Sequence, residues 1–386
     1  MARKPITNSK INGNEYYRTR LLIRYDANGK KIMKNFYGSS KTEAENKKKE
    51  YLQMIESGIN PDLGLISLEK ALYSWLWNIE RYSGNKTSTF ERYESVFRNH
   101  IQGSTIGRIS VLDINKLSIQ KFYNEILDSN KSIESIRKVL SKFFQFALSE
   151  GYIVRNPMQG MKLPKKHEDT ISEKNTEVTT FTKDELKTIL ESVGNVKIRY
   201  VIMFAALTGA RIGEILALEK TDISNDFVRI QKSIRNVRVY IDQNNYHYEI
   251  KLTRPKSESS IRDVPIPNIL KSELKNLSIL TKEEKLKLGP AYFDNNLLFP
   301  SSTGTYLDVN NVRTSWKRAL ISANIPYKKF HTLRHTYATQ LIKNGVDLLT
   351  VSRLLGHSSI KTTEIYAHTL EETKIEAVQS LNDMFA

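Results

Sequence analysis

Two segments near the C-terminus concentrate side chains that can carry or transfer protons. Four of the seven histidines occur there, at His331, His335, His357 and His368. They lie in the stretches HTLRHTYAT and LLGHSSIKTTEIYAH, and such clustering is difficult to attribute to core packing. The second stretch also contains Tyr366, which could be one more aromatic core residue among 19 tyrosines or a nucleophile.

Arginines accompany these histidines. His331 and Arg334 are three residues apart, so a helix presents both on one face. Arg211 lies upstream in FAALTGARIGEILAL, which predicts an apolar helix, a Thr-Gly break and a second helix beginning at Arg211. Burying an arginine beside so much apolar sequence is costly without a partner. Arg211 therefore either faces an anion in a cleft or pairs with Glu214.

Arginine, histidine, lysine and tyrosine together can carry out transfer of a phosphoryl group. Attack on a phosphodiester places negative charge on its non-bridging oxygens, which guanidinium groups match bidentately. A histidine can take the proton of an attacking hydroxyl near neutral pH. Tyrosine, whose ordinary pKa is about 10, can then form a covalent intermediate. Such a site needs no metal, because two arginines supply the positive charge.

A zinc site is the alternative reading of the histidines. His331 and His335 have the i, i+4 spacing of helical metal ligands. However, HTLRH lacks the glutamate expected beside the first histidine and carries Arg334 between the two. No paired-aspartate pattern and no phosphate-binding Gly-rich loop stands out, so we expect neither a metal nor another cofactor.

The chain is strongly basic and contains no cysteine. Its 386 residues carry 59 Lys and Arg against 42 Asp and Glu, a formal net charge of +17, which indicates a polyanionic partner such as nucleic acid. The lack of cysteine excludes disulfides and thiol catalysis. No apolar run is long enough to span a membrane, and the first residues lack the apolar core of a secretory signal. We therefore expect a soluble cytoplasmic protein with no membrane partner.

The first sixty residues predict strand, strand and helix. Two β-rich runs flank Asn28-Gly29, a strong hairpin signal, and a third short strand is expected beside them. The helix KTEAENKKKEYLQMIESG has a weak apolar face made of Ala44, Leu52 and Ile55. Basic residues on the strands predict a sheet that enters a DNA major groove, or else the solvated face of a small accessory domain.

Helices follow, and then a mixed domain. Residues 65–160 predict a bundle of four or five helices, and its first amphipathic stripe consists of Leu68, Leu72, Trp75, Leu76 and Ile79. Prolines and charges without periodicity mark a linker over 161–179. The last domain, 180–386, combines helices with a central β-rich stretch, and Thr182 and Glu185 have the spacing of a capping box at its start.

Four boxes resemble, in order and spacing, the signatures of the tyrosine recombinase (phage integrase) family: TGARIGEILAL, RPKSESSIRDVPIP, HTLRHTYAT and LLGHSSIKTTEIYAH. The likeness spans nearly all of the last domain, and the upstream layout resembles the three-domain integrases of temperate phages and integrative conjugative elements. It implies a multidomain α+β fold. The expected parts are an arm-type DNA-binding domain with a small β-sheet and a helix over 1–62, an all-α core-binding bundle over 65–160, and a mixed α/β catalytic domain over 180–386. Its final helix, 371–386, would pack on a neighbouring protomer or on its own domain.

The resemblance also implies roles for single residues. Arg211 and Arg334 would clamp the scissile phosphate, and Glu214 would brace Arg211. His357 would bind a non-bridging oxygen of the phosphate. His331 would accept the proton of the nucleophile or hydrogen-bond the phosphate.

The nucleophile and the acid complete the implied set. Tyr366 would attack the phosphate, and Lys256 would protonate the departing 5′-oxygen, with the nearby Lys251 as the alternative acid. His335 and His368 match no role in the family.

The implied activity is site-specific recombination of a mobile element. Tyr366 would become joined to a DNA 3′-phosphate, and religation would need no ATP because the phosphotyrosyl bond conserves the energy of the cut bond. The implied partners are core-type and arm-type sites on double-stranded DNA, a homotetramer on a four-way Holliday junction, a directionality factor and a DNA-bending protein. Two alternatives are a type IB topoisomerase, against which the basic N-terminal sheet argues, and a non-catalytic DNA-binding regulator, against which the retained polar side chains argue.

Overall fold

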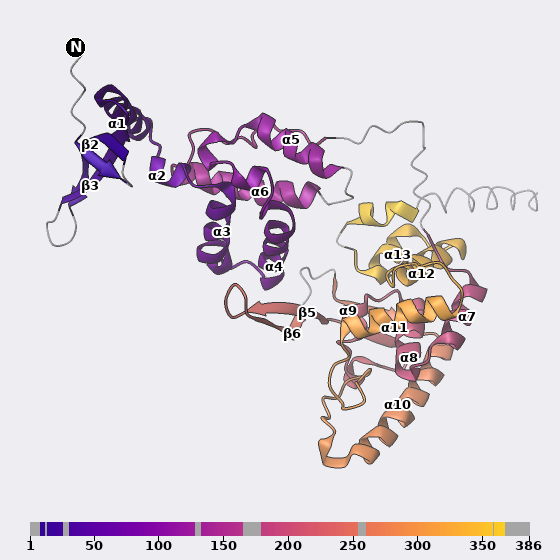
Figure 1. Cartoon of the computed structure of the whole chain (residues 1–386). Helices are drawn as coiled ribbons and strands as arrows, with labels where there is room; N and C mark the ends of the chain where they lie inside the picture. The colour runs from indigo at the N-terminus through magenta and orange to yellow at the C-terminus, as the bar shows by residue number, and fades with distance from the viewer. Residues whose placement is uncertain are drawn as a thin grey trace, which may run out of the picture. The chain divides into compact units, whose positions relative to one another are not determined.

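The computed structural model describes residues 8–11, 14–25, 31–127, 133–164, 179–253, 260–357 and 359–366. Contacts divide the chain into two units, Met1–Asp169 and Thr170–Ala386 (Figure 1). Several expected features lie wholly or mostly outside the described residues: the turn at Asn28-Gly29, the linker over 161–179, Lys256, His368 and the final helix over 371–386.

A three-stranded antiparallel sheet, ordered β1-β2-β3, opens the first unit. Its elements are β1 (Ser9–Ile11), β2 (Asn14–Tyr25) and β3 (Lys31–Gly38), followed by helix α1 (Lys41–Glu56). The predicted strands and helix are confirmed, but the expected apolar face of α1 is partly wrong. The helix buries Ala44 and Tyr51, and the Tyr51 ring packs edge-on against Phe36 of β3 at 5.3 Å. Ile55, in the last turn, is exposed.

Helices make up the rest of the first unit, as the amphipathic patterns predict. They are α2 (Pro61–Gly64), α3 (Leu68–Asn78), α4 (Thr87–Val96), α5 (Lys116–Leu127) and α6 (Ile133–Ser149). Trp75 of α3 is buried and contacts Phe143 of α6 edge-on at 5.9 Å. The predicted stripe of α3 is buried except for Ile79, which is exposed because the helix ends one residue earlier.

The second unit mixes helices with two antiparallel strand pairs, β4-β7 and β5-β6. Its elements are α7 (Lys183–Ser192), α8 (Val196–Thr208), α9 (Ile212–Ile215), β4 (Phe227–Ile230), β5 (Ser233–Tyr240), β6 (Tyr246–Thr253), β7 (Arg262–Pro265), α10 (Asn268–Leu288), α11 (Val309–Ser322), α12 (Thr332–Lys343) and α13 (Leu348–Leu355). The capping box at the start of α7 forms as predicted, with Glu185 N donating to Thr182 Oγ1 at 3.1 Å and Thr182 N to Glu185 Oε2 at 2.9 Å.

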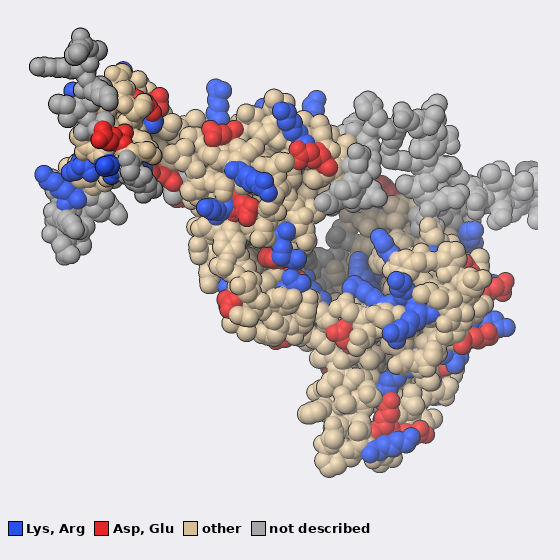
Figure 2. Space-filling model, in the orientation of Figure 1, with Lys and Arg blue, Asp and Glu red and all other residues tan. Residues whose placement is uncertain are grey.

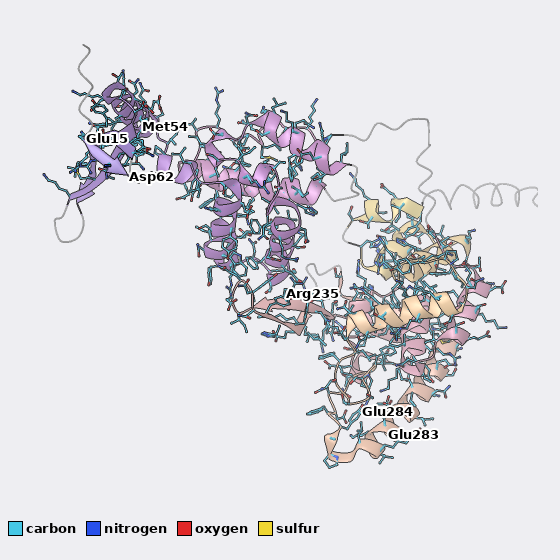
Figure 3. The ribbon with its side chains drawn as sticks, viewed as in Figure 1. Glu15, Met54, Asp62, Arg235, Glu283 and Glu284 are labelled. Carbon is cyan, nitrogen blue, oxygen red and sulfur yellow. The ribbon has the colours of Figure 1, made fainter. Side chains whose placement is uncertain are left out.

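The main core of the second unit surrounds Trp316 of α11, which contacts Phe181 edge-on at 5.6 Å and Phe330 at 5.5 Å. The long helix α10 carries Glu284, which is labelled in Figure 3. An ion pair between Glu284 and Lys197 ties this helix to α8. A separate, smaller apolar cluster joins α12 to α13 and contains Tyr366. Among the described residues, no helix combines the length and the apolar character needed to cross a membrane.

Candidate active site

A buried carboxylate holds two arginines at the start of α9. Arg211 is the residue before the helix, and its Nη1 donates to Glu214 Oε1 at 2.8 Å, while its backbone N–H donates to Oε2 at 2.9 Å. Arg262 of β7 donates from Nη2 to the same Oε2 at 2.8 Å. The two readings of Arg211 are therefore not exclusive. It pairs with Glu214, and 40% of its side chain remains exposed.

Arg334 is buried on the first turn of α12 and is fixed by backbone carbonyls. Its Nη1 donates to Gly209 O at 2.9 Å and its Nη2 to Leu355 O at 2.6 Å. Gly209 ends α8 in the left-handed conformation with φ 63°, which glycine adopts without steric cost. A Cβ there would approach Tyr337 Cδ1 at 2.5 Å. The Thr-Gly break therefore orients the carbonyl that positions Arg334.

Arg211, His331 and Arg334 line one cavity of about 450 Å³. His331 is the residue before α12, and Arg334 follows one turn later, so the predicted shared face is confirmed. Lys and Arg side chains gather over the part of the second unit where α11, α12 and α13 lie (Figure 2). The cavity wall also includes Arg313, Tyr327 and Lys329, for which the sequence gives no motif.

The charges around the cavity are predominantly positive. Burial, together with the charges of Arg211 and Arg262, lowers the pKa of Arg334 to about 9. Arg334 still remains cationic at neutral pH. Burial alone would raise the pKa of Glu214, but Arg262 and Arg211 outweigh it and hold that pKa below its ordinary value. An anion placed among these guanidinium groups would relieve their mutual repulsion.

Two histidines lie in the same electrostatic field. Loss of water around the buried His331 ring, together with the charges of His335 and Arg334, lowers its pKa to about 4. Desolvation, then Arg334 and Arg211, likewise lower the pKa of His357 to about 4. Both rings are therefore neutral at pH 7. His357 Nδ1 lies 2.8 Å from Thr363 Oγ1, which leaves Nε2 for another partner.

Tyr366 is fully buried in the smaller cluster, among Ala338, Ile342, Val351 and Leu355. Its hydroxyl lies 2.7 Å from His335 Nδ1. Burial raises its pKa to about 12, against the opposing charge of Arg334. The phenol is therefore neutral at pH 7, and it can attack phosphorus only if another group takes its proton.

The structure brings most of the predicted residues together. Arg211, His331 and Arg334 line the cavity, and Glu214 contacts Arg211 behind it. The arginine charges reach His357 and Tyr366. Lys256 is outside the described residues, whereas Lys251 is on β6, opposite Arg235 of β5. Sequence reasoning missed two contacts, that of Arg262 with Glu214 and that of His335 with Tyr366. Arg262 does lie inside a box singled out by resemblance, RPKSESSIRDVPIP.

The same residues can be tested as metal ligands. His331 and His335 face each other edge to face, with ring centroids 5.0 Å apart. His335 already directs Nδ1 at the Tyr366 hydroxyl. Within the described residues, no group of three or more His, Asp or Glu side chains is arranged to hold a metal ion.

Glu214→Ala is expected to lower the free energy of unfolding by about 3–5 kcal/mol, because it leaves Arg262 buried without its carboxylate. Since the pKa of Glu214 is lowered in the folded state, this contribution is complete above its ordinary value of 4.5 and is lost as the pH falls below it. Urea unfolding at pH 7 and pH 4 measures both effects. Glu191→Ala, an exposed site on α7, is the control, and a loss below about 1 kcal/mol at Glu214 would contradict this account.

Comparison with known proteins identifies the family. Residues 179–373, just over half of the chain, match the model of the phage integrase family. A tyrosine recombinase XerC-like protein of Caldanaerobacter subterraneus subsp. tengcongensis is 40% identical over 398 aligned residues, with all of both chains covered. The chain belongs to the phage integrase family. It is a site-specific tyrosine recombinase. An integrase of the element ICEBs1 from Bacillus subtilis is 25% identical, covering 78% of this chain and 79% of its own.

Solved integrase structures share the fold of this recombinase. The Tn1549 transposon integrase, determined with a circular intermediate DNA, superposes with a TM-score of 0.60 at 16% identity over 78% of this chain and 94% of its own. The lambda integrase in a tetramer on a Holliday junction gives 0.56 at 20% identity over 93% and 97%. The fold class inferred from the sequence, a small sheet with helices followed by a mixed α/β domain, is confirmed.

Proposed function

We propose that this recombinase cuts and rejoins DNA strands of a mobile element through a 3′-phosphotyrosine at Tyr366. The observation that carries the proposal is that the charges of Arg211, Arg262 and Arg334 act on one another around the carboxylate of Glu214. Cationic groups that repel one another in the free protein are preorganised to stabilise the charge of a pentavalent phosphorus. The buried phenol of Tyr366 lies within the field of one of them.

The reaction divides among the residues as follows. The Tyr366 oxygen attacks phosphorus while the bond to the 5′-oxygen breaks, and Arg211 and Arg334 hold the non-bridging oxygens. His331, neutral at pH 7, takes the phenolic proton or binds the phosphate. Lys256 gives a proton to the departing 5′-oxygen, with Lys251 as the alternative acid. The reverse attack by a 5′-hydroxyl of another strand restores the phenol.

His357 and Glu214 complete the set. With the Thr363 hydroxyl donating to Nδ1, the neutral His357 ring carries its proton on Nε2 and donates it to a non-bridging oxygen. Glu214 orients Arg211 and Arg262 through its two oxygens and does not touch DNA. Arg262 is mostly buried, so it acts by positioning Glu214.

The remaining parts of the chain would bind specific DNA sites. We assign residues 1–62 to arm-type sites, residues 65–160 to core-type sites, 161–179 to a linker and 180–386 to catalysis. By analogy with the lambda integrase tetramer on a Holliday junction, four protomers would exchange strands in turn, and the helix 371–386 would pack in trans. A directionality factor and a DNA-bending protein would set the outcome in the cytoplasm.

A nicked suicide substrate tests the chemistry directly. When cleavage releases a short strand, the protein stays attached, and mass mapping is expected to find the adduct on Tyr366. The yield should be unchanged in EDTA, because guanidinium groups supply the positive charge that a metal would give. An adduct on another residue, or formation only with a divalent metal, would refute the proposal. Relaxation of supercoiled plasmid without joining of two sites would favour the topoisomerase alternative.

A further inference from the structure

The active-site cavity extends beyond the residues that the reaction uses. Its lining includes Arg313, Tyr327 and Lys329 as well as Arg211, His331 and Arg334, and we call the first three residues the second wall. We propose that this second wall is a binding site for another phosphodiester of the cleaved strand, next to the scissile one. The proposal rests on the proposed function, because it needs a DNA strand with its phosphate between the two catalytic arginines.

The loop that carries Tyr327 and Lys329 is held in place by Trp316. The buried indole donates from Nε1 to Lys328 O at 2.9 Å, and its ring packs edge-on against Phe330 at 5.5 Å. Phe181 packs on Trp316 at 5.6 Å. The loop is therefore anchored on the main core of the unit, so its side chains are preorganised before any ligand binds.

Neighbouring lysines of this loop have opposite roles. Lys328 points into the fold, where its Nζ donates to Glu185 Oε1 at 2.8 Å, to Oε2 at 2.9 Å and to Thr180 O at 3.0 Å. Tyr327 and Lys329, the residues on either side of Lys328, both line the cavity. Lys328 is used for structure, while Lys329 is exposed.

The cations of this wall have no acidic partner in the described part of the chain. Within the described ranges, neither Arg313 nor Lys329 forms an ion pair, and the one polar contact of Arg313 is a long 3.5 Å hydrogen bond from Nη1 to Asn310 Oδ1. Arg313 is exposed on α11. Two unpaired cations beside the positive catalytic wall favour an anion over a neutral group.

A phosphodiester suits this wall better than a free carboxylate or an isolated phosphate would. The subsite shares one cavity with the two arginines assigned to the scissile phosphate, and a DNA strand supplies a second phosphate at a fixed spacing from the first. Tyr327 is 64% exposed, so its ring is available to contact the sugar or base between the phosphates. Two adjoining anion sites would fix the direction of the strand as well as its position.

Binding to core-site DNA tests the subsite without requiring cleavage. Tyr366→Phe protein is titrated with core duplex over a range of salt concentrations, alone and combined with Arg313→Gln or Lys329→Gln. Each second substitution is expected to weaken binding about tenfold at low salt and to reduce the slope of log affinity against log salt by about one unit. Arg318→Gln is the matched control, since Arg318 is exposed on α11 about 140° around the helix from Arg313. Equal effects of Arg313→Gln and Arg318→Gln would overturn the proposal.

A substrate change then identifies the contacted group. Neutral methylphosphonates replace the phosphodiesters one and two positions on either side of the scissile one, singly. At one of these positions, the neutral linkage should weaken binding about tenfold when Arg313 is intact. The same linkage should not change the affinity of the Arg313→Gln protein, which has already lost this contact. If the affinity losses caused by the methylphosphonate and by Arg313→Gln multiply at every position tested, the two changes act independently, and the proposed subsite would be overturned. Failure of the wild-type protein to form an adduct would instead reject the proposed function, because the binding measurements do not depend on cleavage.

Discussion

Tyr366→Phe should abolish the covalent protein–DNA adduct while binding of core DNA stays within about twofold of wild type. Phenylalanine keeps the ring in the cluster with Ala338 and Leu355 and removes only the hydroxyl. The folded protein then loses the 2.7 Å contact with His335, worth about 1 kcal/mol. Strand cleavage should fall about 10⁶-fold, as when other covalent nucleophiles are removed. Denaturing gels of a labelled suicide substrate measure the adduct, and a filter or gel-shift titration measures binding.

The matched control for this substitution is Tyr200→Phe on α8. Tyr200 is partly buried in the same unit, so the control removes a phenolic hydroxyl at comparable cost to packing. It should form the adduct at the wild-type rate. An adduct that persists in Tyr366→Phe would assign the nucleophile elsewhere, whatever the control does.

Arg211→Lys is expected to lower the single-turnover cleavage rate by about 10²–10³-fold. One guanidinium can donate to Glu214 and to a phosphate at the same time, whereas an ammonium is a point charge that cannot reproduce this fork. Glu214 binds Arg211 through Nη1 at 2.8 Å, so the remaining N–H groups are oriented by that bond. Because the charge is kept, the salt dependence of binding should not change.

Arg318→Lys on α11 provides the comparison, since it makes the same exchange at an exposed site outside the cavity wall. Its cleavage rate should match wild type. A rate for Arg211→Lys within threefold of wild type would place Arg211 outside the reacting phosphate's reach.

Local patterns in the sequence were sufficient to predict the helices that carry the site residues. The apolar run ending in Thr208-Gly209 predicted a helix stop, and glycine supplies the left-handed φ that the stop requires. The three-residue spacing of Arg211 and Glu214 gave their pairing as one of two alternatives, because such neighbours face each other at a helix start, and this pair is present. The same reasoning set His331 and Arg334 on one face.

Local patterns could not predict contacts between residues that are far apart in the sequence. Arg262 reaches Glu214 across 48 residues, and the alternation of β7 shows that Arg262 is buried without showing what it meets. His335 and Tyr366 are 31 residues apart, and the cluster that joins them exists only once α12 and α13 pack. Exposure at the ends of helices was also missed, as at Ile79, since periodicity defines a stripe but not where the neighbouring elements stop.

The division of the second unit into two apolar clusters separates what must stay fixed from what can move. The residues around Arg211 rest on the large core, while the phenol belongs to a satellite of five buried side chains. Opening so small a cluster costs far less than global unfolding. Departure of the Tyr366 ring alone would therefore expose the reactive oxygen by a local fluctuation, while the carbonyls of Gly209 and Leu355 keep Arg334 in place.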